Sequence, residues 1–421
     1  MSVRCWRPVI AVLVAAAAAA GSAGPEQAAA GVAASSVPVS LSSAGAQGSG
    51  SSCCGVVSGD GRLVAFNSVA TNLVAHDTNG VQDVFVRDVA GAKTRRISVS
   101  SDGAQANGPS RIDDISSDGR YVVFRSAATN LVPRDTNHHV DVFVRDLTAA
   151  MTRRVTNTRK GVQGKTNAGQ ASISANGDFV IFRESYGSRC GSYGVYVKDR
   201  LSGTLRLIRR KSNGAPMCLL DTPCGRAGSV SGGRISDDGQ IATFQRRDKL
   251  SDCSAAPEVF LRDRTTGRTH TFDVFSREQD LSPSGRYVVF ASGSDGQDVF
   301  LRDRVTKTTT QLTGSDTQPP SGVSSHARIS DDGAFVTFQS TASDLVSGDT
   351  NKRTDVFLHD VLGATTTRLS VTPGGNQLSR KSTRPSISAD GRFVAFDSSA
   401  ENIVVGDANH HRDVFLRGPL R

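Results

Sequence analysis

The sequence predicts an all-β fold: a seven-bladed β-propeller of four-stranded blades, closed by an N-terminal strand that completes the last blade. Three observations lead to this prediction. Val, Thr, Ser and Gly dominate the chain beyond its N-terminus, which favours short strands joined by turns. A strand–turn–strand phrase with a glycine in its turn recurs seven times. A segment near the N-terminus also matches the one strand that the last repeat lacks.

Residues 1–30 are expected to be a secretory signal peptide. Arg4 and Arg7 precede an apolar, alanine-rich run, and small residues follow it. The alternative, a membrane anchor, is disfavoured because the run is shorter than the ~20 residues that a membrane span needs. We therefore expect a secreted or periplasmic (extracytoplasmic) protein with no membrane span, in which residues 31–421 form a single propeller domain.

The repeat unit contains four strands, which we call a, b, c and d. Strands a and b flank an Asp-Gly, Asn-Gly or Ser-Gly turn, as in "DISSDGRYVVF" at Asp114–Phe124. Strand c is of the type "DVFVRD" and strand d of the type "TRRISV". Strands b and c are apolar at nearly every position, as expected for strands buried on both faces. The turn glycines are Gly61, Gly119, Gly177, Gly239, Gly285, Gly333 and Gly391.

The two ends of the chain predict how the ring closes. The last unit ends after strand c, at "DVFLRGPLR". The segment Val37–Gly50 matches Arg95–Gly108, which is strand d of the first unit with the connection that follows it. Val37–Ser43 is therefore predicted to supply strand d of the seventh blade and to leave no open sheet edge.

The pattern "SxDGRxVxF … DVFVRD … TRRxS" resembles the TolB-type, WD-repeat-like propeller repeats that are common in exported bacterial proteins. The resemblance covers about residues 37–421. It implies a propeller fold and a non-catalytic binding or scaffold role. TolB itself has an additional N-terminal α/β domain and six blades, whereas seven blades are predicted here.

Four loops between strands b and c carry the pattern Asp-x-Asn-x-x-x-Asp. Oxygen ligands in this spacing are typical of weak calcium loops. The alternative is an Asx turn, in which the short side chain bonds its own backbone and fixes the route into strand c. The loops belong to units 6, 7, 1 and 2, which ring closure makes consecutive, so the face that they share is expected to be asymmetric. The candidate calcium ligands are Asp77, Asn79, Asp83, Asp135, Asn137, Asp141, Asp349, Asn351, Asp355, Asp407, Asn409 and Asp413.

Six cysteines follow the predicted signal peptide, and an even number in an oxidising compartment favours disulfides. We expect Cys190 to pair with Cys253 between adjacent blades, and Cys218 to pair with Cys224 within one connection. The remaining two, Cys53 and Cys54, are adjacent, and a disulfide between them would be strained. Six cysteines allow about fifteen connectivities.

The charge distribution and the absence of catalytic motifs exclude several classes of function. The formal net charge is +9, but Arg and Lys are scattered and stacking aromatics are few, which argues against nucleic-acid binding. The chain contains no GxSxG or HExxH motif. We therefore expect a monomer that binds a protein or a cell-envelope polymer, without catalysis and without a required cofactor. The expected surface is the face where the b–c and d–a connections open.

The alternative is a polysaccharide lyase or hydrolase whose residues converge on the central channel from several blades. Such a site leaves no linear motif. A channel lined by a unique cluster of acid, His, Arg or Tyr side chains would favour the enzyme. A channel lined only by residues that repeat in every blade would favour the binding protein.

Overall fold

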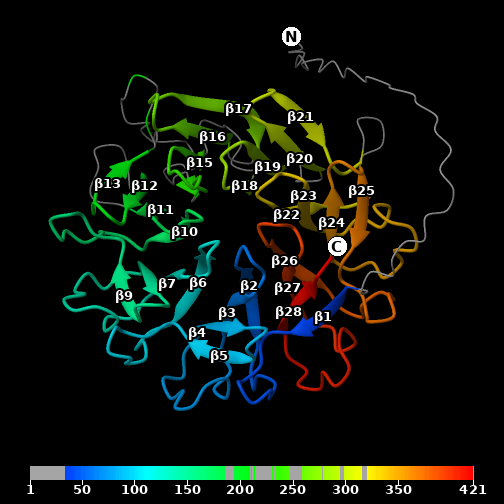
Figure 1. The fold of residues 1–421 in the computed structure, drawn as a ribbon, viewed down its shortest axis with the longest axis horizontal. Helices are drawn as coiled ribbons and strands as arrows, with labels where there is room; N and C mark the ends of the chain where they lie inside the picture. Colours follow the sequence, from blue (N-terminus) through cyan, green and yellow to red (C-terminus); the bar gives the residue numbers. More distant parts are fainter. Residues whose placement is uncertain are drawn as a thin grey trace, which may run out of the picture. The chain divides into compact units, whose positions relative to one another are not determined.

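The structure is a computed structural model in which the described residues form seven four-stranded antiparallel sheets around a central axis (Figure 1). The prediction of an all-β, seven-bladed propeller is confirmed, and the described residues contain no helix. The signal peptide predicted for residues 1–30 lies outside them and stays a prediction. The described residues are 34–184, 194–208, 210, 213, 230–231, 233–246, 258–276, 278–293, 298–314 and 320–420.

Each of the first six blades takes its strands consecutively from the chain, with the first strand nearest the axis and the fourth at the rim (Figure 1). Blades 1 and 2 comprise β2 (Ser52–Val57), β3 (Leu63–Ser68), β4 (Asp83–Asp88) and β5 (Lys93–Arg96), then β6 (Ser110–Ile115), β7 (Tyr121–Ser126), β8 (Asp141–Asp146) and β9 (Met151–Arg154). Blades 3 and 4 comprise β10 (Gly169–Ile173), β11 (Phe179–Glu184), β12 (Gly194–Asp199) and β13 (Leu205–Leu207), then β14 (Val230–Ser231), β15 (Ile241–Arg246), β16 (Glu258–Asp263) and β17 (Thr269–Phe275). Blades 5 and 6 comprise β18 (Gln279–Leu281), β19 (Tyr287–Ser292), β20 (Asp298–Asp303) and β21 (Thr308–Gln311), then β22 (Ser324–Ile329), β23 (Phe335–Ser340), β24 (Asp355–Asp360) and β25 (Thr365–Arg368).

The seventh blade joins the two ends of the described chain. It contains β26 (Ser382–Ile387), β27 (Val394–Ser398) and β28 (Asp413–Gly418), and its rim strand is β1 (Ser35–Pro38). β1 pairs antiparallel with β28, with Val37 opposite Leu416. The predicted ring closure is therefore confirmed.

The predicted bounds of the closing strand, Val37–Ser43, are wrong at both ends. The strand begins at Ser35 and ends at Pro38, at the position that matches the end of β5 in blade 1. Beyond Pro38 the chain turns into the connection to blade 1, where the Leu41 N–H bonds the Val39 carbonyl. Pro38 is tolerated because a rim strand has one edge without a partner strand.

The core lies between neighbouring blades. The b and c strands are buried on both faces, as their apolar sequences predicted, and all six residues of β3 are buried. One aromatic ring from strand b contacts one from strand c in every blade, with centroids 5.4–6.2 Å apart. Clusters of apolar side chains then join each sheet to the next; one of them contains Phe66 of blade 1 and Leu416 of blade 7.

The turn glycines are required by both conformation and packing, as Gly61 illustrates. Its φ of +74° lies in the left-handed region that residues with a Cβ rarely adopt. A Cβ added at Gly61 would also lie 2.2 Å from the Phe393 ring of the neighbouring blade. The turn therefore fixes the spacing between two blades as well as the hairpin itself.

Replacing Gly61 with Ala should destabilise the fold more than replacing Gly45, which also has a positive φ (+84°) but has open space around it. Gly45→Ala should cost about 1–2 kcal/mol from backbone strain alone. Gly61→Ala should cost about 1–3 kcal/mol more, because Phe393 must move. Chemical denaturation of the two variants measures the difference, and equal losses of stability would contradict the packing role.

Candidate ligand-binding site in the central channel

The inner strands of the seven blades surround a cavity of about 330 Å³ on the axis of the propeller. These strands enter from the face that carries the b–c and d–a connections, and they end at the glycine turns on the opposite face. The start of each inner strand therefore lines the channel mouth on the first face, and the residues next to the turns line the other end.

The channel lining varies from blade to blade although the scaffold behind it does not. The residue three positions before each turn glycine is a buried serine in all seven blades, and in blade 1 the Ser58 hydroxyl accepts the Leu63 N–H at 3.0 Å. The residue five positions before the glycine faces the channel and differs between blades. These channel residues are Val56, Asp114, Ser172, Arg234, Asp280, Arg328 and Ser386.

Arg234 connects blades on opposite sides of its own. Its Nη1 lies 3.1 Å from Oδ2 of Asp114, and its Nε lies 2.9 Å from Oδ1 of Asp280. Asp114 also accepts the Ser172 hydroxyl at 2.7 Å. One guanidinium thus holds residues of blades 2 and 5 from its position in blade 4, an arrangement that no single repeat encodes.

Arg328 forms no ion pair with any of the described residues. Its Nη1 donates to the Ala327 carbonyl at 2.9 Å, and among the described residues no carboxylate oxygen lies within ion-pair distance of it. Burial, together with the neighbouring charge of Arg234, lowers the pKa of Arg328, while the charges of Asp280, Glu278 and Asp114 oppose that shift. A guanidinium in this position has several N–H groups free to bind an anion.

A histidine–carboxylate pair lies at the channel mouth. The His326 Nε2 is 3.3 Å from Oε1 of Glu278, whose other oxygen accepts the His326 backbone N–H at 2.7 Å. Burial lowers the pKa of His326, while the charge of Glu278 opposes that shift. The imidazole is therefore neutral at neutral pH and able to accept a proton.

A second group at the mouth is centred on the buried carboxylate of Asp397. It pairs with Arg412 and, at 3.6 Å, with Arg384, and it accepts the Cys54 backbone N–H at 3.2 Å. Burial raises the pKa of Asp397 to about 6, against the opposing charges of Arg412 and Arg384. Arg384 also lines the cavity that contains Arg234 and Arg328, so three guanidinium groups lie around the same space.

The opposite end of the channel is framed by backbone hydrogen bonds between adjacent blades. The Gly59 N–H donates to the Ser117 carbonyl at 2.9 Å, and Ser117 donates to Ala175 at 3.0 Å. Asp331 donates to Ala389, which donates in turn to Gly59, both at 3.0 Å. These bonds hold the glycine-turn ends of the blades at fixed separations.

Acidic side chains gather at this framed end. Burial raises the pKa of Asp331 to about 6, and the negative charges of Asp237 and other nearby carboxylates add to the shift. Burial also raises the pKa of Asp237, although its Oδ1 accepts the Ala175 N–H at 2.7 Å. The glycine-turn end of the channel is therefore acidic, whereas arginine, histidine and carboxylate side chains together line the rest of the cavity.

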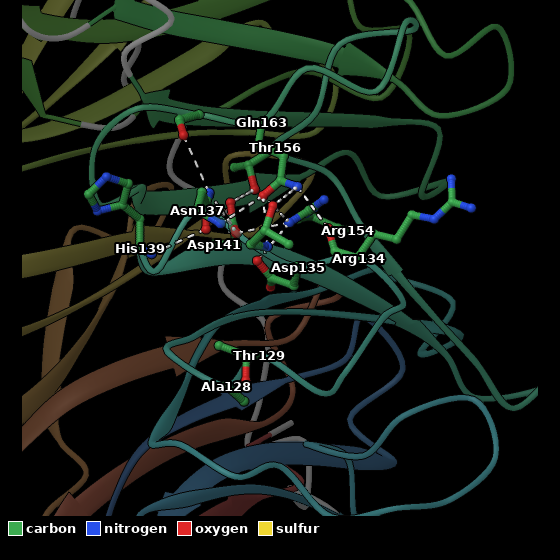
Figure 2. A network of polar contacts seen from close by, with 12 residues as sticks. Ala128, Thr129, Arg134, Asp135, Asn137, His139, Asp141, Arg154, Thr156 and Gln163 are labelled. Atoms are coloured by element: carbon green, nitrogen blue, oxygen red, sulfur yellow. Dashed lines mark hydrogen bonds and ion pairs between the residues drawn. The ribbon is translucent and has the colours of Figure 1, made fainter.

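The Asp-x-Asn-x-x-x-Asp loops form Asx turns, the alternative considered from the sequence. In the second loop the Asn137 side-chain oxygen accepts the His139 N–H at 3.1 Å, and its amide nitrogen donates to Oδ2 of Asp141 at 3.1 Å (Figure 2). The Thr156 hydroxyl donates to the other oxygen of Asp141. These bonds fix the route of the chain into β8.

An arginine from strand d lies between the two carboxylates of this loop (Figure 2). The Arg154 Nη1 is 2.9 Å from Oδ1 of Asp135 and 3.4 Å from Oδ2 of Asp141, and it donates to Gln163 at 3.0 Å. In the first loop Arg96 contacts both acids in the same way, and in the third loop Arg368 pairs with Asp349 at 3.2 Å.

The fourth loop lacks this arginine. Pro38 of the closing strand occupies the matching position, and Asp407 and Asp413 have no ion pair among the described residues. Burial, followed by the charge of Asp413, raises the pKa of Asp407. The sequence carried this signal, because strand d ends in an arginine in units 1, 2 and 6 and not in unit 7. The loop motif alone did not reveal the role of that arginine.

No structural observation tests the predicted calcium binding. The described residues include no group of three or more His, Cys, Asp or Glu side chains arranged to hold a metal ion. The predicted disulfides also stay predictions, because Cys190, Cys218, Cys224 and Cys253 all lie outside the described residues. Cys53 and Cys54 are described, carry free thiols and lie beside the channel mouth.

No model of a known protein family matches the chain, and a search of curated proteins found no relative. Solved structures do match. An oligogalacturonate lyase in complex with manganese has a TM-score of 0.55 at 13% identity, over 92% of this chain and 98% of that one. The β-propeller domain of the Trilobed protease from Pyrococcus furiosus has a TM-score of 0.52 at 12% identity, over 87% and 94%.

TolB from Acinetobacter baumannii also matches, with a TM-score of 0.42 at 15% identity. The match covers 76% of this chain and 63% of the TolB chain. The protein is thus a β-propeller whose structural neighbours include TolB proteins, as the repeat pattern suggested. They also include enzymes, and identities this low show the fold alone. No helix in the described part of the chain is long and apolar enough to cross a membrane.

Asp331→Asn should stabilise the protein near neutral pH by about 2 kcal/mol. Because the pKa of Asp331 is raised to about 6 in the folded protein, ionisation of this carboxyl group destabilises the fold. This destabilisation is absent below the pKa of the unfolded chain, near pH 4, and grows as the pH rises through about 6. The gain should therefore vanish at about pH 4. The control is Asp332→Asn, which removes a carboxylate that accepts the Ala334 N–H and should not stabilise. A gain independent of pH would contradict the assignment.

If calcium binds, the fourth loop is the expected place, because an arginine already pairs with carboxylates in the other three. About 1 mM calcium should then raise the unfolding temperature by about 2 °C or more. Asp407→Asn should abolish the rise, whereas Asp349→Asn should leave it intact. Absence of calcium from the wild-type protein in equilibrium dialysis would remove the prediction.

Proposed function

We propose that the protein binds a carboxylate-bearing polymer of the cell envelope in the central channel, which the polymer enters from the face that carries the b–c and d–a connections. The observation that supports this most directly is the guanidinium of Arg328, which has no ion pair among the described residues and lies in a cavity that Arg384 also lines. An acidic segment of a partner protein would bind the same arginine side chains, and the binding experiment below distinguishes such a partner from a polymer.

The physical argument rests on charge and on the shape of the face. A guanidinium binds a carboxylate through charge-assisted, often bidentate hydrogen bonds, which are stronger in a partly buried site than in water. The net charge of +9 attracts polyanions over longer distances. The variable channel lining supports one specific orientation of the ligand, because its polar groups differ from blade to blade.

The second candidate is the polysaccharide lyase or hydrolase considered from the sequence. The channel is lined by acid, His and Arg side chains that differ from blade to blade, and such a lining favours an enzyme. His326 and Glu278 would supply the proton-transfer group, since a neutral imidazole oriented by a carboxylate is a suitable general base. Arg328 would neutralise the substrate carboxylate in either function.

Binding is tested with polygalacturonate and other uronic-acid polymers against the full chain, by calorimetry at two salt concentrations. Arg328→Gln should weaken binding about tenfold or more, because a buried charge-assisted contact is worth about 1.5–3 kcal/mol. The matched control is Arg153→Gln, which removes an exposed charge from β9 at the rim. Equal affinities of Arg328→Gln and the wild type would contradict the proposal, and retention of acidic proteins alone would favour the protein partner.

The same polymers decide between binding and catalysis. Formation of unsaturated or reduced-length products by the wild type would identify an enzyme, and His326→Gln should then lower the rate by about 10²–10⁴-fold. Binding without any product over long incubation would support the non-catalytic function. Loss of both binding and turnover only in Arg328→Gln would assign that residue to substrate binding.

A further inference from the structure

Two adjacent cysteines, Cys53 and Cys54, lie at the start of β2 beside the channel mouth. Their Sγ atoms are 2.7 Å apart, and Cys54 lines the cavity. The pair occurs in only one of the seven repeats; the matching residues in blade 6 are Ser325 and His326. A residue needed for the blade itself would recur, so the pair has a role that is particular to this place.

The backbone brings the two sulfur atoms together. Neighbouring side chains of a regular strand point to opposite faces. Here the pairing of β2 with β3 shifts register between Cys53 and Val56, and Cys54 adopts a φ of +64°. His326 has a similar positive φ, 55°, at the matching position of blade 6, so the bulge belongs to the fold and the cysteines occupy it. Both thiols therefore lie on the same side of the strand.

The contact between the two thiols shifts their pKa values in opposite directions. The hydrogen bond from Cys54 lowers the pKa of Cys53 to about 7, although burial opposes the shift. The same hydrogen bond, followed by burial, raises the pKa of Cys54 well above its usual range. A large fraction of Cys53 is therefore thiolate at neutral pH, which is the nucleophilic form, while Cys54 keeps its proton.

We propose that Cys53 and Cys54 form a thiol–disulfide exchange site, at which a small-molecule or protein disulfide oxidises the pair to a vicinal disulfide. The Cys53 thiolate attacks one sulfur of the incoming disulfide and releases the first thiolate. Cys54 then loses its proton and attacks Cys53 Sγ, which releases the second. Two electrons and two protons pass to the incoming disulfide, yielding two thiols and one Cys53–Cys54 bond.

Geometry indicates exchange rather than permanent cross-linking. Adjacent Cα atoms are ~3.8 Å apart across a trans peptide, whereas disulfides usually span Cα separations of ~4.4–6.8 Å. A bond between neighbours is therefore strained, and strained disulfides are the more easily reduced ones. The site should cycle between both states rather than remain oxidised as a structural disulfide does.

The location connects the pair to the groups at the channel mouth. The Cys54 backbone N–H donates to Asp397 at 3.2 Å, and Asp397 pairs with Arg412 and Arg384. Rearrangement of the Cys53–Cys54 peptide on oxidation would act on this anchored carboxylate. The exchange site itself does not depend on the proposed ligand, and its test requires none.

The experiment uses the full chain equilibrated in buffers of graded reduced-to-oxidised glutathione ratio, then alkylated and digested with trypsin. The sequence has no Lys or Arg between Arg7 and Arg62, and trypsin does not cleave the Arg7–Pro8 bond. The chain therefore carries Cys5→Ser, so that the peptide ending at Arg62 contains Cys53 and Cys54 and no other cysteine. A vicinal disulfide leaves this peptide unlinked, unalkylated and lighter by two hydrogen atoms. The expected result is one reversible transition between this form and the doubly alkylated form.

Three results would overturn the proposal. These are two free thiols at every ratio, a persistent mixed disulfide with glutathione, and a cross-link from this peptide to another cysteine. The isolated peptide is the control for the fold: its transition should need a more oxidising buffer, because nothing holds its sulfur atoms together. An equal midpoint for peptide and protein would also contradict a site built by the structure.

Two single-cysteine variants, which cannot form the vicinal disulfide, test which of the two cysteines is the nucleophile. In Cys54→Ser, Cys53 should still be alkylated at neutral pH about fivefold faster than in the unfolded chain, because serine can also donate a hydrogen bond. In Cys53→Ser, Cys54 should react slowly. Retained cooperative unfolding of both variants confirms that they fold, and equal reactivity of the two cysteines would refute the assignment of Cys53 as the nucleophile.

Discussion

The pairing of β1 with β28 is the interaction on which the rest of the structure depends. Each sheet is apolar on both faces, so a blade is stable only when a neighbour covers each side. In an open row of blades, the first and last would each expose one such face. The four residues Ser35–Pro38 prevent this by tying the beginning of the propeller into its last blade. The buried hydrogen bond from Ser40 to Asp413, at 2.6 Å, extends the same junction.

Closure also determines what the channel can do. Because the ring fixes the separation of all seven inner strands, residues from different blades meet at defined distances on the axis. The contacts of Arg234 with Asp114 and Asp280 need that constraint, since the partners come from separate blades. The buried serines and turn glycines maintain the blades, while the residues that face the channel are free to differ. A repetitive scaffold thus carries one site that does not repeat.

The repeat made most of the fold predictable. A phrase seen once would not have distinguished a hairpin from many alternatives, but seven copies fixed the blade number, the strand order and the missing strand. The bounds of the closing strand were wrong because alignment to the first repeat extended it beyond Pro38 into the following connection. The Asx turns were also predictable, since Asn137 and its equivalents act within a few residues of chain.

The candidate site could not be predicted in the same way. Arg234 and Asp114 are distant in the chain, and only the folded ring shows that they meet. Arg328 has no ion pair among the described residues, and the carboxylates of Asp114 and Asp280 pair with Arg234 instead. The approach of Cys53 to Cys54 depends on a bulge, which a regular strand pattern does not reveal. Each of these features arises from packing around the axis rather than from local propensity.

The most direct test of ring closure is the thermal unfolding of a chain that lacks residues 34–42, with and without a synthetic peptide of residues 34–50. We predict that the deletion lowers the unfolding temperature by about 10 °C or more, because blade 7 loses its rim strand and its junction with blade 1. The added peptide should restore much of the loss. An unchanged unfolding temperature in the truncated protein would contradict the claim that this strand holds the propeller together.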